Sequence, residues 1–211
     1  MPVQPTARAE PLDRRAETAS ALRPSIADEH GLVARVRTGD RAAFDELVLT
    51  YCDPLCNFVT IIVGSAGTAE ELVQEVFLKI WRMRSGWHIR SNLRSYLFGA
   101  AYKAALNECR RAALRQRWEA RVAACGEAPM MSEAGEPADR HVETLELRAA
   151  LRLAIQQMPP RCREAATLRF EHDLSCPDIA QAMGITVKAA ERHASNALHL
   201  LRAALGPYLD R

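Results

Sequence analysis

The chain has 211 residues, of which 48% are hydrophobic and 26% charged, and its formal net charge is +2. This composition is typical of a soluble globular protein with one or two domains. The longest apolar run, 58–63, is far shorter than the eighteen or so residues that a membrane-spanning helix needs. The N-terminus also lacks the hydrophobic core of a secretory signal. We therefore expect a cytoplasmic protein without membrane insertion.

The first helical pattern follows an irregular N-terminal stretch. Residues 1–29 contain four prolines and no apolar period, which predicts a disordered arm. Apolar residues recur at helical spacing from Leu32. Asp40 can cap a second helix, and Pro54 is expected to end or kink it because proline lacks the backbone N–H. The apolar pattern then continues to Gly64.

The next segment predicts an amphipathic helix with one acidic face. Thr68 and Glu71 have the spacing of a capping box, so we expect the helix to begin at Thr68. Apolar residues between 72 and 80 form one stripe, and Glu71, Gln74 and Glu75 share the opposite face. Such a face is either solvated or a docking surface for a basic partner.

The acidic face is followed by a basic stretch. Residues 78–121 carry eleven Lys and Arg side chains against two Glu, a local balance of +9. Aromatic residues are interleaved with these cations, which is typical of grooves that hold single-stranded nucleic acid. Phe98 and Tyr96 lie near the apolar stripe of the predicted helix, whereas Trp87 is predicted to be exposed in a loop. Trp87 and Tyr96 are the candidates for a base pocket.

These segments resemble a known family. AEELVQEVFLKIW (69–81) and LRSYLFGAAYKAALNECRR (93–111) are similar to region 2 of bacterial sigma factors of the extracytoplasmic-function (group 4) type, and GDRAAFDELVLTYCDPL (39–55) adds to the match. The resemblance implies that the acidic helix docks on the β′ clamp helices of core RNA polymerase. It implies that the following loop and helix bind and open the −10 promoter element.

The resemblance also implies individual roles. Docking falls to Glu71, Gln74 and Glu75. Where the family commonly has Arg-Asn and then Asp, this chain has Tyr102-Lys103 and Asn107, so docking transfers more directly than any −10 sequence. The residues predicted to contact −10 DNA are Trp87, Arg94, Tyr96, Tyr102, Lys103, Asn107, Arg110 and Arg111.

The C-terminal part predicts a helix-turn-helix. Glycine and proline mark a linker before Asp139, which can cap a helix that stops at Met158. Pro160 suits the first turn of the next helix, which includes Phe170 among its apolar positions. Ser175 with Asp178, Gly184 and Thr186 then predict a short helix, a tight turn and a longer helix.

With the preceding LAIQQMPPRCREAATLRFEHDLS, this pattern resembles sigma region 4. The second helix of such a pair enters the major groove, and the resemblance implies contacts to the −35 duplex and to the β flap of the polymerase. The family usually shows more cations here than Arg192-His193-Ala194-Ser195-Asn196. The predicted −35 DNA-binding residues are Thr186, Lys188, Arg192, Ser195 and Asn196.

The sequence thus predicts an all-α protein of two small helical domains joined by a flexible linker. We expect an alternative sigma factor that is not an enzyme, needs no cofactor or metal, and is held by an anti-sigma partner. The predicted boundaries are 1–29 for the arm, 30–116 for region 2, 117–138 for the linker, 139–206 for region 4 and 207–211 for the tail.

Two alternatives remain open from the sequence. One is a stand-alone helix-turn-helix regulator that binds an operator as a dimer, which leaves the acidic face unexplained. The other is a metal or redox sensor built on Cys52 and Cys56, four residues apart, with His30 or His172. Their spacing lacks the usual arrangement of metal ligands.

Overall fold

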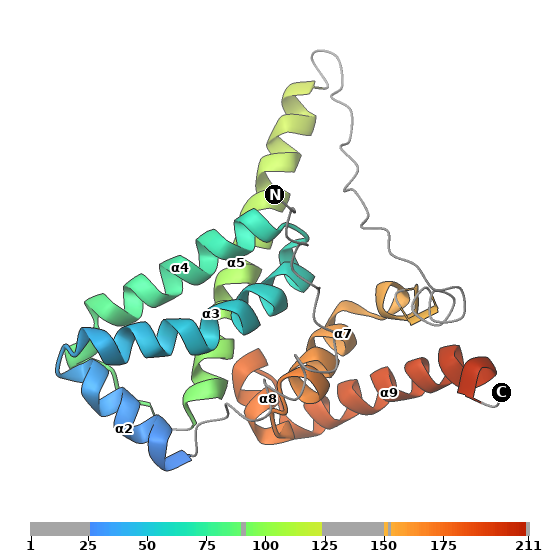
Figure 1. The fold of residues 1–211 in the computed structure, drawn as a ribbon. Coiled ribbons are helices and arrows are strands. Elements are labelled where there is room, and N and C mark those ends of the chain that lie inside the picture. The colour runs from blue at the N-terminus through green and yellow to red at the C-terminus, as the bar shows by residue number, and fades with distance from the viewer. Residues whose placement is uncertain (1–25, 90–91, 124–149, 152, 210–211) are drawn as a thin grey trace, which may run out of the picture.

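A computed structural model describes residues 26–89, 92–123, 150–151 and 153–209 of the chain. Every regular element in these ranges is helical (Figure 1). The elements form an N-terminal module (26–123) and a C-terminal module (153–209), which lie side by side. The predicted all-α fold with two helical domains is confirmed.

The N-terminal module is a bundle around one core. The aromatic rings of Phe58 and Phe98 meet there edge to face with centroids 5.5 Å apart, and Leu47, Leu55 and Leu97 are fully buried. Its elements are α2 (Ile26–Arg37), α3 (Arg41–Val63), α4 (Ala66–Arg82), the 3₁₀ turn η1 (Arg84–Gly86) and α5 (Leu93–Ala123).

The helix starts follow local capping chemistry. Asp40 caps α3 as predicted, because its Oδ1 accepts the Ala43 backbone N–H at 3.2 Å. The predicted start of α4 at Thr68 is wrong: the helix begins at Ala66, and Ser65 is the cap. The Ser65 hydroxyl accepts the backbone N–H of Thr68 at 3.4 Å, so Thr68 is the donor in this cap and not the capping residue.

Pro54 is expected from the sequence to end or kink its helix, but the helix does not end there. α3 runs unbroken through Pro54 to Val63. Proline removes one backbone hydrogen bond from the helix, but Tyr51 and Leu55 on either side are buried in the core. Tertiary packing therefore holds the helix together across the proline.

Two other boundaries differ from the expectation. α2 begins at Ile26, so residues 26–29 of the predicted arm are helical, whereas residues 1–25 lie outside the described part. α5 continues to Ala123, so the first residues of the predicted linker are also helical. Alanine, arginine, leucine and glutamine dominate this end of α5 and are strong helix formers. Asp139 and the rest of the predicted linker lie outside the described residues.

The C-terminal module is a smaller helical unit. Residues 153–157 are helical and end before Met158, and Pro160 opens α7 as predicted. Phe170, expected at an apolar position of this helix, lies in the π-helical turn that follows α7 and is 50% exposed. The elements are α7 (Pro160–Ala166), the turn η2 (Thr167–Glu171), α8 (Cys176–Met183) and α9 (Val187–Leu209).

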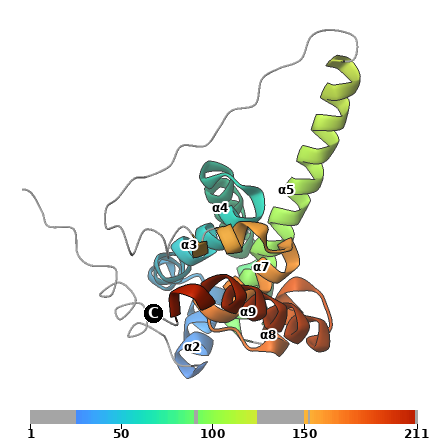
Figure 2. The same ribbon diagram turned by 90° about the vertical axis from the view of Figure 1, so that its right-hand side faces the viewer.

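The two modules pack through α5 and α8, as both views show (Figures 1 and 2). The far end of α5 projects away from this contact. By length and composition α3 is long and apolar enough to cross a membrane. One of its faces, including Tyr51, Leu55 and Phe58, instead forms the core of the N-terminal module, which is how a core helix of a globular protein packs.

Candidate functional site

The outer face of α4 is acidic and uncovered. Glu71, Gln74 and Glu75 are exposed, and none of their side chains makes a hydrogen bond or ion pair with another described residue. Leu78 continues this face one turn further and is 51% exposed. The opposite face is buried from Leu72 to Ile80. The structure thus brings the three predicted docking residues together and adds an apolar position that the sequence reading missed.

A cavity of about 430 Å³ opens between α4, the segment after it and α5. Trp87 and Tyr96 line it with ring centroids 5.8 Å apart. Lys79 and Lys103 also line it and place positive charge beside the aromatic rings. Aromatic faces for stacking and cations for phosphate are the two components of a single-stranded nucleic-acid site. Three of the predicted −10 residues therefore share one cavity.

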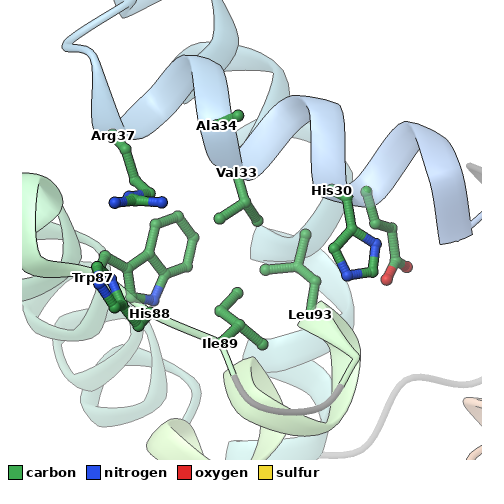
Figure 3. Close-up of a pocket in the computed structure, with 9 residues that line it drawn as sticks. His30, Val33, Ala34, Arg37, Trp87, His88, Ile89 and Leu93 are labelled. Atoms are coloured by element: carbon green, nitrogen blue, oxygen red, sulfur yellow. The ribbon is translucent and has the colours of Figure 1, made fainter.

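The prediction that Trp87 is exposed is wrong: its side chain is 4% exposed. The indole also lines a second cavity of about 280 Å³ under α2, together with Val33, Ile89 and Leu93 (Figure 3). The apolar face of α2 covers the ring, a contact that the loop sequence alone does not indicate. Its Nε1–H is buried without a hydrogen-bond partner among the described residues.

Tyr102 and Arg94 contact the C-terminal module. The Tyr102 hydroxyl donates to Glu164 Oε2 at 2.8 Å, and Arg94 Nη1 donates to the His172 carbonyl at 3.0 Å. Tyr102 is 1% exposed, and burial together with the neighbouring Glu164 raises its pKa. Among the predicted −10 residues, Lys103, Asn107, Arg110 and Arg111 are exposed on α5.

The helix-turn-helix has the predicted caps and turn. Ser175 accepts the Asp178 backbone N–H at 3.3 Å, and Gly184 adopts a φ of 65°, which favours glycine. Thr186 Oγ1 accepts the Ala189 N–H at 3.2 Å where α9 begins. Because Ala190 and its neighbours on the inner face are buried, the outer face is free. The five predicted −35 residues, Thr186, Lys188, Arg192, Ser195 and Asn196, are all exposed.

The cysteines and histidines of the sensor alternative are dispersed. Cys52 and Cys56 line a polar cleft between α3 and α4. Burial, with Cys52 beside it, raises the pKa of Cys56 to about 12. His30 lines the cavity under α2, and His172 is half-buried between the modules. Within the described ranges no three His, Cys, Asp or Glu side chains converge as metal ligands would.

The two modules match two known protein families separately. Sigma-70 region 2 matches residues 47–115, and Sigma-70, region 4, matches residues 148–201. The RNA polymerase sigma-H factor of Pseudomonas aeruginosa is 30% identical over 194 residues, which cover 84% of this chain and 94% of that protein. The ECF RNA polymerase sigma factor SigW of Bacillus subtilis is 23% identical over 176 residues, with coverage of 82% and 94%.

Two solved structures have a similar fold. CnrH in complex with the cytosolic domain of CnrY has a TM-score of 0.58 at 20% identity, with 85% of this chain and 97% of that one covered. RpoE in complex with the anti-sigma factor NepR, from Bartonella quintana, has a TM-score of 0.55 at 24% identity, with coverage of 77% and 96%. With both region profiles matched, the chain belongs to the sigma-70 family, as an alternative sigma factor of the extracytoplasmic-function type.

Proposed function

We propose that this sigma factor docks on core RNA polymerase through the exposed face of α4, reads −35 duplex with α9 and holds opened −10 DNA at α5. The observation that carries the proposal is the separation of three surfaces of different chemistry: the acidic face of α4, the cationic aromatic cavity, and the polar face of α9. A stand-alone operator-binding protein would need only the third. The protein would act in the cytoplasm as an initiation factor without enzymatic activity.

The assignment of DNA contacts rests on the chemistry of these faces. Arg192 and Asn196 are exposed in the N-terminal half of α9, the part of a recognition helix that faces base edges. Arginine can contact guanine and asparagine can contact adenine in a bidentate manner. We assign Lys188 and Thr186 to the phosphate backbone, which lysine and threonine side chains contact in protein–DNA complexes.

Run-off transcription tests the proposal as a whole. The purified chain is added to core RNA polymerase on genomic fragments, including the DNA upstream of its own coding sequence. Discrete transcripts that depend on the chain are expected. A chain that binds these fragments tightly as a dimer without polymerase, and yields no transcript with it, would support the operator-binding alternative instead.

Leu78 is proposed to complete the docking face. Leu78→Ser is expected to weaken binding to core polymerase by roughly tenfold, because burying one leucine in an interface contributes about 1.5–3 kcal/mol at most. The melting temperature should stay unchanged, since the side chain is largely exposed. Leu49→Ser, at an exposed leucine of α3, is the matched control in the same titration. Equal affinity for the two variants would remove Leu78 from the interface.

Trp87 and Tyr96 are proposed to form the wall on which an extruded −10 base stacks. Trp87→Leu is expected to slow promoter opening, because base stacking on an aromatic ring contributes about 1–3 kcal/mol. Trp87→Phe should open promoters nearly as fast as wild type. Permanganate reactivity of the −10 thymines measures opening, and footprinting of the closed complex should be unaltered.

Substitution by leucine is preferred to alanine because Trp87 is buried. Truncating a buried tryptophan to alanine costs about 3–5 kcal/mol of stability, which would confuse folding with function. Trp118→Leu changes a tryptophan that is 70% exposed on the projecting end of α5 and serves as control. Wild-type opening by folded Trp87→Leu protein would refute the stacking role.

An anti-sigma factor is a further proposed partner. The solved structure of RpoE holds an anti-sigma factor. By analogy, we propose that such a protein binds this chain and covers surfaces needed for polymerase or promoter. Co-purification of this chain with a protein encoded beside it, and loss of run-off transcription when that protein is added, would test the partnership.

A further inference from the structure

We propose that the cavity under α2 is a binding site for a small aromatic carboxylate. The cavity has a volume of about 280 Å³ and lies between α2, the segment that follows η1 and the first residue of α5. Small-molecule sites usually have volumes of about 300–1,000 Å³, so this cavity suits a ligand of one or two fused rings. The site itself is independent of the proposed function, whereas its effect on promoter opening rests on it.

The walls of the cavity are suited to an apolar, flat body. Val33, Ile89 and Leu93 line it with aliphatic side chains from three parts of the chain, and the indole of Trp87 closes one end (Figure 3). An apolar molecule gains free energy when it leaves water for such walls. Aromatic rings also pack favourably against an indole in offset or edge-to-face geometry, which favours an aromatic body over an aliphatic one.

One polar atom at this cavity lacks an acceptor. Trp87 is 4% exposed, and its Nε1–H is buried without a hydrogen-bond partner among the described residues. Figure 3 shows this nitrogen on the edge of the ring that faces Ile89. A buried water needs two to four polar partners, but Val33, Ile89 and Leu93 offer it no polar side-chain atom. A ligand oxygen that accepts this N–H removes the cost of the unsatisfied donor.

Positive charge at the Trp87 end of the cavity selects an anionic acceptor. Arg37 and His88 line the cavity and flank the indole (Figure 3), and Arg37 forms no ion pair with a described residue. The carboxylate among the described lining residues, Glu29, lies about two turns away along α2 and accepts the Tyr51 hydroxyl at 3.0 Å. A ligand carboxylate beside Arg37 therefore makes a charge-assisted hydrogen bond, which is stronger than a neutral one.

The same indole separates this cavity from the proposed base pocket. Trp87 lines both the cavity under α2 and the cavity of about 430 Å³ that it shares with Tyr96. A carboxylate that accepts its N–H holds the ring in the orientation in which it faces Tyr96. Because this preorganises the wall on which a base stacks, the ligand and opened −10 DNA favour each other's binding by the same factor. The site thus couples a small metabolite of this class to promoter opening.

Calorimetric titration of the full-length chain with 1-naphthoate tests the site. A dissociation constant between about 10 μM and 1 mM is expected for a ligand of this size. Ala34 lines the cavity, so Ala34→Leu places a larger side chain in it and should abolish binding. Ala42→Leu, at an exposed position of α3 outside the cavity, is the matched control. Absence of binding by wild-type protein, or equal affinity of wild type and folded Ala34→Leu, would overturn the site.

Two further substitutions test the polar contacts. Trp87→Phe removes the N–H but keeps an aromatic ring, and it should weaken naphthoate binding by about tenfold or more. Arg37→Gln should weaken naphthoate binding to a similar degree and leave binding of the neutral analogue 1-naphthylmethanol unchanged. Arg41→Gln makes the same charge change at an exposed position of α3 and should bind naphthoate as wild type does. Wild-type affinity in both Trp87→Phe and Arg37→Gln would contradict the assigned ligand class.

The extent of promoter opening measures the coupling. With polymerase and wild-type protein, saturating naphthoate is expected to raise the equilibrium constant for opening by about fivefold or more, as permanganate reactivity of the −10 thymines reports. Trp87→Phe keeps the stacking ring, and its opening should not respond to naphthoate. Naphthoate binding without any change in wild-type opening would overturn the coupling. Absence of transcripts from wild-type protein would instead count against the proposed function, because calorimetry requires neither polymerase nor DNA.

Discussion

Replacing Glu71 and Glu75 by lysine is expected to abolish binding of the chain to core RNA polymerase in a pull-down assay. Both carboxylates are exposed on α4 and have no partner among the described residues, so they are available to a basic surface. Reversing their sign places like charges against that surface, which costs several kcal/mol in an interface. At 1.4 kcal/mol per tenfold, such a cost lowers affinity by a hundredfold or more.

The control must change net charge equally without touching α4. Asp45→Lys combined with Glu46→Lys makes the same charge change on exposed positions of α3 and should leave polymerase binding nearly intact. The exposed Arg35–Glu46 ion pair that it breaks contributes about 0–1 kcal/mol. Retained binding by folded protein with lysine at 71 and 75 would show that α4 is not the docking face.

Arg192→Ala is expected to weaken binding of −35 duplex by about 1–3 kcal/mol, roughly fivefold to 150-fold, if the guanidinium contacts a guanine. Arg192 is exposed on α9, in the half of the helix that follows the turn. Loss of a base contact should also relax sequence preference at one position, whereas loss of a phosphate contact weakens all sequences alike. Titration of promoter duplexes that differ at single −35 positions distinguishes the two.

Arg202→Ala provides the control, because Arg202 is exposed on the same helix but lies two to three turns beyond Arg192, outside the proposed recognition half. It should bind −35 duplex nearly as wild type does, and the salt dependence of binding should change little. If Arg192→Ala and Arg202→Ala have the same affinity for every duplex, Arg192 does not read a base.

Features set by residues within a few positions of one another could be predicted from the sequence. The cap at Asp40, the cap at Ser175 and the tight turn at Gly184 are as expected. The exposed faces of α4 and α9 also follow from their helical periods. For such features the sequence holds all interacting groups within about one turn.

Features set by distant parts of the chain could not be predicted in this way. Trp87 looks like an exposed loop residue because the surface that buries it comes from α2, more than fifty positions earlier. The hydrogen bond from Tyr102 to the C-terminal module could not be predicted, because its acceptor, Glu164, is 62 positions away. The continuity of α3 through Pro54 likewise depends on packing that outweighs the local cost.

The projecting end of α5 has a consequence for promoter geometry. Residues 113–118 are exposed, and the helix ends at Ala123. At about 1.5 Å per residue, the stretch from 113 to 123 extends roughly 16 Å beyond the bundle. The segment that leads to the C-terminal module therefore starts at the end of this projecting helix, so its starting point is fixed by the length of α5. If α5 and α9 bind the two promoter elements as we propose, this fixed offset and the length of that segment together set the spacing between the elements that the protein can bridge.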